Sequence, residues 1–120
     1  MMNRLVLKSI FSPDVDLRSW VPDSEEDVFL ALELEISSSE NLSESNMFFV
    51  TLSTSEGLKR NRKNFLLVEN RTLVVSQFDY FSLKSSIEQI LEKCCRNSWS
   101  ESCEVLQRYF LWEYEDFERV

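Results

Sequence analysis

The stretch that decides the fold is Trp99-Ser-Glu-Ser-Cys-Glu-Val-Leu-Gln-Arg-Tyr-Phe-Leu-Trp-Glu-Tyr-Glu-Asp-Phe117. In its first half, apolar side chains recur three and four residues apart, at Trp99, Cys103, Leu106 and Phe110. This spacing places them along one face of an α-helix and predicts that the helix, continuing to Phe110, packs on a core. Ser98 and Glu101 form a capping box, which predicts where the helix begins.

The second half of the same stretch has a different period. Trp112 and Tyr114 alternate with Glu113 and Glu115, which is typical of an extended segment rather than a helix. One face of this segment is therefore aromatic and the other acidic. We expect the aromatic side to hold the fold together, which leaves the glutamates as candidates for function.

Another helix is predicted immediately upstream. Asp79 suits its N-cap position, and the helix is expected to run to about Cys95. Within it, apolar residues recur at helical spacing at Leu83, Ile87, Ile90, Leu91 and Cys94. Asn97 suits a left-handed residue that closes the helix.

Further upstream the hydrophobic pattern is that of β-strands. The predicted strands are residues 3–10, 28–36, 47–53 and 65–77, with 72–76 the firmest part of the last one. The clearest is 28–36, where one face carries Leu30, Leu32, Leu34 and Ile36 and the other carries Ala31, Glu33 and Glu35. This alternation predicts a strand with one buried face.

The segments between the strands differ in composition. Residues 12–27 form a long loop, for which Trp20 is the expected anchor. Residues 37–45 are rich in serine and glutamate and are predicted to form a hairpin connection. Gly57 is the one glycine, and it precedes a basic stretch, residues 58–64, that suits a short helical turn or a loop.

Because the strands come first and the helices last, the predicted class is α+β. We expect an antiparallel sheet of about four strands, with a short C-terminal strand as an optional addition, and two C-terminal helices packed on one face. A chain of 120 residues can bury a core without metal or disulfide bonds, so residues 1–120 are expected to form one domain.

The net charge is −8, and the acidic residues are unevenly distributed. Between Ser12 and Asn46, ten acidic residues accompany a single basic one, Arg18. Such a surface repels phosphate groups, so neither nucleic acid nor an anionic membrane is an expected partner, whereas a basic protein is. Solubility alone is the other explanation for the excess of acid.

The composition leaves little room for catalysis. Histidine, the commonest general base, is absent, and a single glycine cannot build a phosphate-binding loop. Carboxylates two residues apart occur as Asp14/Asp16, Glu33/Glu35 and Glu113/Glu115. Turn capping is favoured for the first pair and a solvated strand face for the second. We expect no enzymatic activity, no cofactor and no metal site.

Three cysteines crowd into the predicted helices, which does not resemble a secreted disulfide framework. Cys94 and Cys103 fall on apolar stripes and are predicted core residues, whereas Cys95 lies one step away. The N-terminal residues lack the continuous apolar region of a signal peptide, and no stretch is long enough to span a membrane. A cytoplasmic location is therefore expected.

Three segments carry a resemblance to a known family. They are Leu7-Lys-Ser-Ile-Phe-Ser-Pro-Asp-Val-Asp-Leu17, Phe78-Asp-Tyr80 before a helix, and Trp99 followed by Leu106-Gln-Arg-Tyr-Phe-Leu-Trp-Glu-Tyr-Glu-Asp-Phe117. In this order they resemble the immunity protein 8 family of bacterial polymorphic toxin and contact-dependent inhibition systems. The resemblance implies a small, non-enzymatic α+β protein that binds and neutralises a toxin domain encoded beside it. Ser53-Thr-Ser-Glu-Gly57 departs from the family pattern, which leaves the conformation of residues 53–64 open.

Together, the resemblance and the charge lead to one hypothesis. An acidic surface of this protein covers a basic toxin domain, with a nuclease as one candidate activity. The candidate contacts, chosen on charge and expected exposure, are Asp23, Glu25, Glu26, Glu40, Glu44, Glu113, Glu115 and Asp116. The alternative is an adaptor or secretion chaperone that binds another basic protein. The free protein is expected to be a monomer or a weak dimer.

Overall fold

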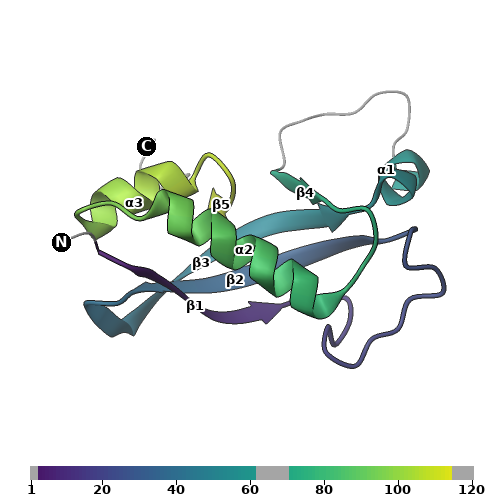
Figure 1. Ribbon diagram of the computed structural model, residues 1–120, viewed down its shortest axis with the longest axis horizontal. Helices are drawn as coiled ribbons and strands as arrows, with labels where there is room; N and C mark the ends of the chain where they lie inside the picture. The colour runs from purple at the N-terminus through teal and green to yellow at the C-terminus, as the bar shows by residue number, and fades with distance from the viewer. Residues whose placement is uncertain (1–2, 62–70, 115–120) are drawn as a thin grey trace.

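The three long strands precede the two main helices along the chain (Figure 1). The structure is a computed structural model that describes residues 3–61 and 71–114. Its strands are β1 (Leu5–Phe11), β2 (Phe29–Ser38), β3 (Asn41–Ser53), β4 (Thr72–Val74) and β5 (Leu111–Trp112). Its helices are α1 (Ser55–Asn61), α2 (Tyr80–Cys94) and α3 (Trp99–Leu106). The predicted α+β class is confirmed.

The strand order in the sheet is β1-β2-β3-β4, and β5 also pairs with β3. The pairs β1/β2, β2/β3 and β3/β5 are antiparallel, and β5 confirms the optional C-terminal strand. The short β4 departs from the predicted antiparallel sheet, because it runs parallel to the end of β3. A parallel neighbour needs a crossover connection, here the segment that contains α1. Residues 65–70 of the predicted fourth strand lie outside the described residues.

The hairpin between β2 and β3 is tighter than predicted. Instead of a connection over residues 37–45, β2 continues to Ser38 and β3 begins at Asn41. Polar side chains do not prevent strand formation here, because their hydroxyl groups find partners. The Ser37 hydroxyl donates to the Glu44 carbonyl at 2.7 Å, and the Ser38 hydroxyl donates to the Asn3 side-chain oxygen at 2.6 Å.

The core lies on one face of the sheet. As the alternation predicts, Leu30, Leu32, Leu34 and Ile36 of β2 are buried. Phe48 and Val50 of β3 pair with Leu34 and Leu32 and are buried beside them. The helices α2 and α3 lie on the same side of the sheet (Figure 1) and add the buried side chains Leu83, Ile87, Leu91, Cys94, Cys103 and Leu106. Burying each large apolar side chain contributes about 1.5–3 kcal/mol.

Helix α2 begins as predicted but ends differently. The Asp79 carboxylate accepts hydrogen bonds from the backbone N–H and the hydroxyl of Ser82, at 3.0 and 2.6 Å. The predicted left-handed ending at Asn97 is wrong, because no described residue has a positive φ and Cys95 is extended. The chain is held in this extended exit by a 2.8 Å hydrogen bond from the Arg96 backbone N–H to the Ser102 hydroxyl.

Helix α3 begins at the predicted capping box. The Ser98 hydroxyl accepts from the Glu101 backbone N–H at 3.2 Å and donates to the Glu101 carboxylate at 3.1 Å. The helix ends at Leu106, before the predicted Phe110, because the chain tightens into a turn in which the Arg108 N–H bonds the Val105 carbonyl. Phe110 is nevertheless a core residue, since only 1% of it is exposed.

The loop of residues 12–27 and the segment that begins at residue 53 are both held in place by contacts with the sheet or with α2. In the loop of residues 12–27, the Trp20 ring packs edge-to-face on Phe78 with the centroids 5.0 Å apart, which confirms Trp20 as the anchor. The sequence leaves the conformation of residues 53–64 open; the described part of this segment includes α1, and residues 62–64 lie outside the described residues. The Thr54 hydroxyl accepts from the backbone N–H groups of Val28 and Gly57, at 2.9 and 3.1 Å, and so joins α1 to the start of β2.

Candidate partner-binding surface

The predicted contact residues do not form one cluster. Asp23, Glu25 and Glu26 are exposed in the loop between β1 and β2. Glu40 and Glu44 are exposed at the hairpin between β2 and β3. These groups lie at opposite ends of the sheet (Figure 1), in a molecule whose longest dimension is 43 Å. One small contact area cannot include both groups.

Glu113 lies at the edge of the sheet, in line with Met47 of β3. Its backbone N–H donates to the Met47 carbonyl at 3.0 Å, and its carboxylate accepts from the Met47 N–H at 3.0 Å. The side chain is half-buried. Glu115 and Asp116 lie outside the described residues.

Among the described residues, no helix covers the second face of the sheet. It is turned away from the viewer in Figure 1, because α2 and α3 lie in front of the sheet. The register places apolar side chains from all five strands on this face, including Phe11, Phe29, Met47, Phe49, Val74 and Leu111. Each of these is half-buried or exposed. The glutamates of β2 stand among them.

A central row of four side chains crosses this face. The register pairs Phe11 with Glu33, Glu33 with Phe49, and Phe49 with Leu111. Directly opposed side chains on neighbouring antiparallel strands have Cβ atoms about 4.5–5.5 Å apart. Glu33 therefore stands between two phenylalanine rings, and we call these four residues the central row.

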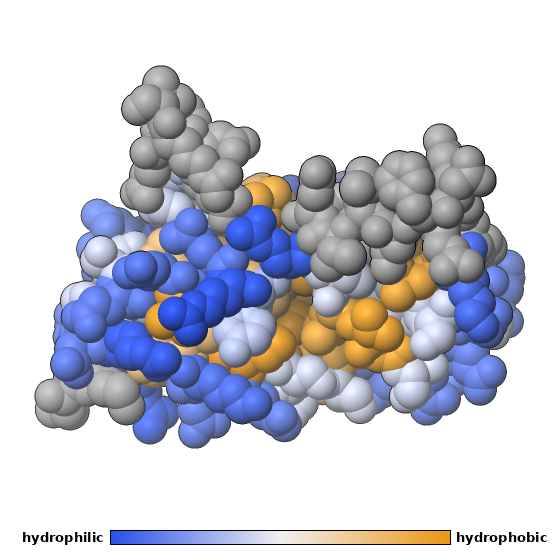
Figure 2. Space-filling view, turned by 90° about the horizontal axis from the view of Figure 1, so that it is seen from above, coloured by the Kyte–Doolittle hydropathy of each residue, from blue (hydrophilic) through white to orange (hydrophobic). Residues whose placement is uncertain are grey.

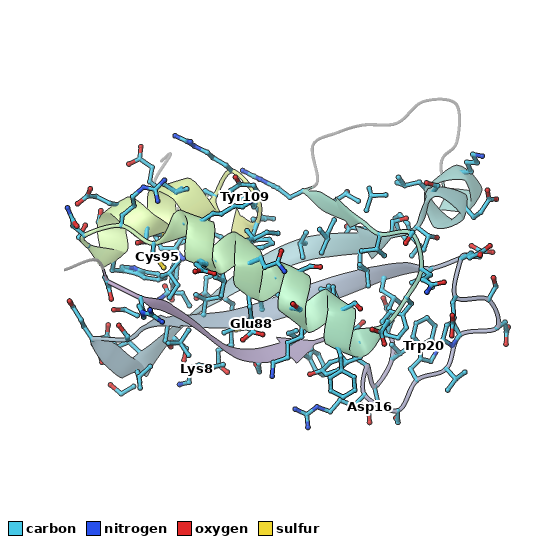
Figure 3. All side chains as sticks on the ribbon, in the orientation of Figure 1. Lys8, Asp16, Trp20, Glu88, Cys95 and Tyr109 are labelled. Atoms are coloured by element: carbon cyan, nitrogen blue, oxygen red, sulfur yellow. The ribbon has the colours of Figure 1, made fainter. Side chains whose placement is uncertain are left out.

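The two glutamates of β2 differ in their surroundings. Glu35 accepts hydrogen bonds from Ser45 and, at 3.1 Å, from Ser9, and these bonds, that of Ser45 above all, hold its pKa below the ordinary value. Lys8, on β1 (Figure 3), acts in the same direction. Glu33 is half-buried and has no hydrogen bond or ion pair with any residue in the described ranges. Of the two β2 glutamates, Glu33 is thus the one without a hydrogen bond or ion pair in the described part of the chain.

A pocket of about 300 Å³ opens beside the central row. Its lining includes Pro13, Ala31, Glu33, Phe49, Arg71 and Leu111. The Arg71 guanidinium donates to the Gln107 carbonyl through Nε at 3.2 Å and Nη2 at 3.0 Å. The pocket thus combines an aromatic ring and aliphatic groups with two opposite charges, the carboxylate of Glu33 and the guanidinium of Arg71, which is bonded to the Gln107 carbonyl.

A second apolar patch lies at the end of the sheet near the loop of residues 12–27. Val21 is 82% exposed and Phe81 is 77% exposed. The Arg18 guanidinium lies 5.7 Å from the centroid of the Tyr80 ring, and a hydrogen bond to the Tyr80 hydroxyl raises the pKa of Arg18. The cation of this patch is therefore engaged with an aromatic ring of α2.

The molecule seen from above in Figure 2 is hydrophobic in the middle and hydrophilic toward both ends. A pocket of about 340 Å³, lined by residues that include Leu52, Val75, Phe78 and Leu83, lies between β3 and α2. Asp79 is the one ionisable group among the described residues that line it, and Asp79 caps α2. The carboxylate at this pocket is therefore already bonded to the start of α2.

The remaining candidate groups have structural roles. Asp16 accepts from the Arg18 backbone N–H at 3.3 Å, which is the predicted turn capping. Asp14 differs from this prediction, because it accepts from the backbone N–H of Ala31 on β2 at 3.2 Å and so ties the loop to the sheet. Cys94 and Cys103 are buried as predicted, and burial raises the pKa of the Cys94 thiol. The half-buried Cys95 (Figure 3) donates to the Leu91 carbonyl at 3.3 Å.

Residues 3–61 and 71–114 hold no group of three or more histidine, cysteine or acidic side chains that could bind a metal ion. In the same ranges, none of the helices has both the length and the apolar character that crossing a bilayer requires.

Comparison with protein families decides what kind of protein this is. The model of the immunity protein 8 family matches residues 5–117. The chain belongs to the immunity protein 8 family. The match runs from β1 past β5 and confirms the resemblance carried by the terminal segments. Neither the curated proteins nor the solved structures yield a match.

Membership implies that this immunity protein binds and neutralises a cognate toxin of a polymorphic toxin system. Immunity proteins are generally inhibitors without catalytic activity, so a binding surface is the site to look for. The sequence pattern assigns Glu33 to a solvated strand face, which is correct, but it does not connect Glu33 with Phe11, Phe49 and Leu111. Only the strand register brings these residues together.

Proposed function

We propose that this immunity protein acts in the cytoplasm, as a monomer or weak dimer, and inhibits a basic toxin domain through its acidic surface. The observation that supports this most directly is the open sheet face, which presents Glu33 and Glu35 to solvent. The net charge of −8 adds a long-range field that attracts a basic protein and repels nucleic acid.

A nuclease is the toxin activity that fits such a surface best. Nucleases bind the phosphate backbone through lysine and arginine side chains, so their substrate-binding surface is positively charged. Carboxylates of the immunity protein would pair with those cations and exclude the nucleic acid. Inhibition of this kind needs contact but no reaction by the immunity protein.

The acidic residues divide into two proposed roles. Those at the two ends of the sheet act at long range and speed the encounter with the toxin: Asp23, Glu25, Glu26, Glu40 and Glu44. The contact role falls to the sheet face and the edge beside it, including Glu113. Glu115 and Asp116 follow Glu113 in the sequence and share its proposed role as contacts.

Co-expression tests the proposed function. The toxin domain encoded beside this chain is induced in a bacterial host, alone, with this chain, or with an unrelated protein of equal charge as the control. Growth arrest by the toxin should be relieved by this chain and not by the control. Arrest that continues in the presence of well-expressed immunity protein would contradict the proposal.

The nuclease assignment has its own test. The purified toxin domain should cleave DNA or RNA, and one equivalent of the immunity protein should stop the cleavage. A toxin domain that arrests growth without cleaving nucleic acid, and that is still neutralised, would remove the nuclease assignment and leave the immunity function in place.

A further inference from the structure

We infer that the central row and the pocket beside it form the toxin-docking surface, and that they receive an apolar side chain of the toxin flanked by a lysine or arginine. The inference rests on the proposed function. It adds the face that makes the contact and the chemistry of the toxin segment bound there.

The apolar part of this surface is suited to an anchor side chain. Phe11 is 55% exposed, and Phe49 and Leu111 are half-buried at the pocket of about 300 Å³. A side chain that enters this pocket contacts Phe49 and Leu111 and loses its own contact with water. Pockets of this type hold the few residues that dominate the energetics of protein interfaces.

The charge of Glu33 determines what must accompany the anchor. A partner that covers the central row removes water from Glu33, which stands between Phe11 and Phe49. Because Glu33 has no partner in the described ranges, an uncharged surface would leave a buried, unpaired carboxylate, which is strongly unfavourable. A lysine or arginine beside the anchor removes this penalty by pairing with Glu33.

Other occupants fit the face less well. A second copy of the chain would bring Glu33 and Glu35 close to a molecule that itself carries a net charge of −8. Nucleic acid is repelled by the same carboxylates.

Charge reversal with a matched control tests the inference. Binding of the full chain to the purified toxin domain is measured by calorimetry near about 0.15 M salt. Glu33→Lys should weaken binding by roughly 30-fold or more, the effect of losing a hot-spot residue. Glu88→Lys makes the same change of net charge on α2, on the other side of the sheet (Figure 3), and should weaken binding by less than about 3-fold.

A second matched pair tests the apolar part. Phe11→Ser removes an exposed ring from the central row and should weaken binding by about 10-fold or more. Phe81→Ser removes an even more exposed ring from the other patch and should leave the affinity unchanged. Weaker binding by Phe81→Ser than by Phe11→Ser would place the docking surface at the loop end and overturn the inference.

The isosteric variant Glu33→Gln separates charge from folding. It should keep the thermal melting temperature of the wild type and still weaken binding by about 10-fold.

If wild-type protein neither binds nor protects, the proposed function fails. If wild-type protein binds and Glu33→Lys and Phe11→Ser bind equally well, the docking surface is wrong while the function stands. A wild-type dimer that Phe11→Ser dissociates in sedimentation would identify a second copy as the occupant and also overturn the inference.

Discussion

At Gly57 the protein has no room for a side chain. A Cβ atom there would overlap the carbonyl oxygen of Val28 and lie 2.7 Å from the carbonyl carbon. Its φ is not positive, so the glycine is required for the close approach of α1 to the start of β2 rather than for an unusual backbone conformation.

Gly57→Ala should therefore destabilise the protein by about 1–3 kcal/mol, because backbone atoms must move to admit the methyl group. In an unobstructed helix the same substitution would stabilise by about 0.4–1 kcal/mol. The free energy of unfolding in urea measures the effect, and Ser55→Ala, at an exposed position of the same helix, is the control. A more stable Gly57→Ala variant would contradict the close packing of α1 on β2.

Asp79 links the start of α2 to pH. Hydrogen bonds from the hydroxyl and backbone N–H of Ser82 hold the pKa of Asp79 below its ordinary value. A carboxyl group whose pKa is lowered by folding contributes stability above its unfolded pKa, about 3.9. That contribution is lost as the pH falls through the lower, folded pKa.

Asp79→Asn keeps a side chain that caps helices but removes the titrating group. We expect the melting temperature of the wild type to exceed that of Asp79→Asn near neutral pH. The difference should shrink as the pH falls below about 3.9, because the carboxylate then binds protons more readily in the unfolded chain than in the folded one. Thermal melts of both proteins from neutral to acidic pH measure the difference in melting temperature, with Asp23→Asn in the exposed loop as the control. A difference that stays constant across this range would rule out the charged cap.

At the scale of elements, the turn after α3 separates core from surface within two residues. Phe110 is 1% exposed and its neighbour Tyr109 (Figure 3) is 42% exposed. Beyond the turn, the Trp112 indole N–H donates to the Asn46 side chain at 3.3 Å, and the Trp112 ring packs edge-to-face on Tyr114 at 5.4 Å. The aromatic side of the C-terminal segment therefore helps to hold β5 against β3, as its alternation predicts.

Phe110→Ala should cost about 3–5 kcal/mol of stability, because it removes a buried ring and leaves a cavity. Tyr109→Ala, one residue away, should cost less than about 1 kcal/mol. Denaturant unfolding of both variants measures the difference. Equal losses would contradict the assignment of Phe110, and not Tyr109, to the core.

At the scale of the whole molecule, the separation of the acidic groups matters more than their number. The acids at the two ends of the sheet are exposed and lie outside the central row, so we expect them to act on the toxin through the field rather than by contact. Glu33 lies inside the proposed contact area. The association rate and the dissociation rate should therefore depend on different residues.

Stopped-flow measurements of binding to the toxin domain, at several salt concentrations and with variants, should separate the effects on association from those on dissociation. The association rate constant should fall by about 10-fold or more between low and high salt. Neutralising Asp23, Glu25, Glu26, Glu40 and Glu44 together should flatten this dependence and leave dissociation unchanged. Glu33→Gln should instead speed dissociation. An association rate independent of salt would contradict a steering role for the end groups.

The sequence by itself determined the features that depend on neighbours a few residues apart. The caps at Asp79 and Ser98, the buried face of β2 and the stripe of α3 follow from spacing, because helix and strand periods are local properties. The sequence also determined the family, since the family model matches residues 5–117.

Only the tertiary structure decided features that depend on distant contacts. Three features differed from expectation: the end of α2 near Asn97, the length of the β2–β3 hairpin and the direction of β4. In each case residues elsewhere in the chain supply the hydrogen bonds that hold the backbone. The central row is the clearest case. Phe11, Glu33, Phe49 and Leu111 lie far apart in the sequence, and hydrogen bonding between β1, β2, β3 and β5 fixes the register that aligns them on the helix-free face.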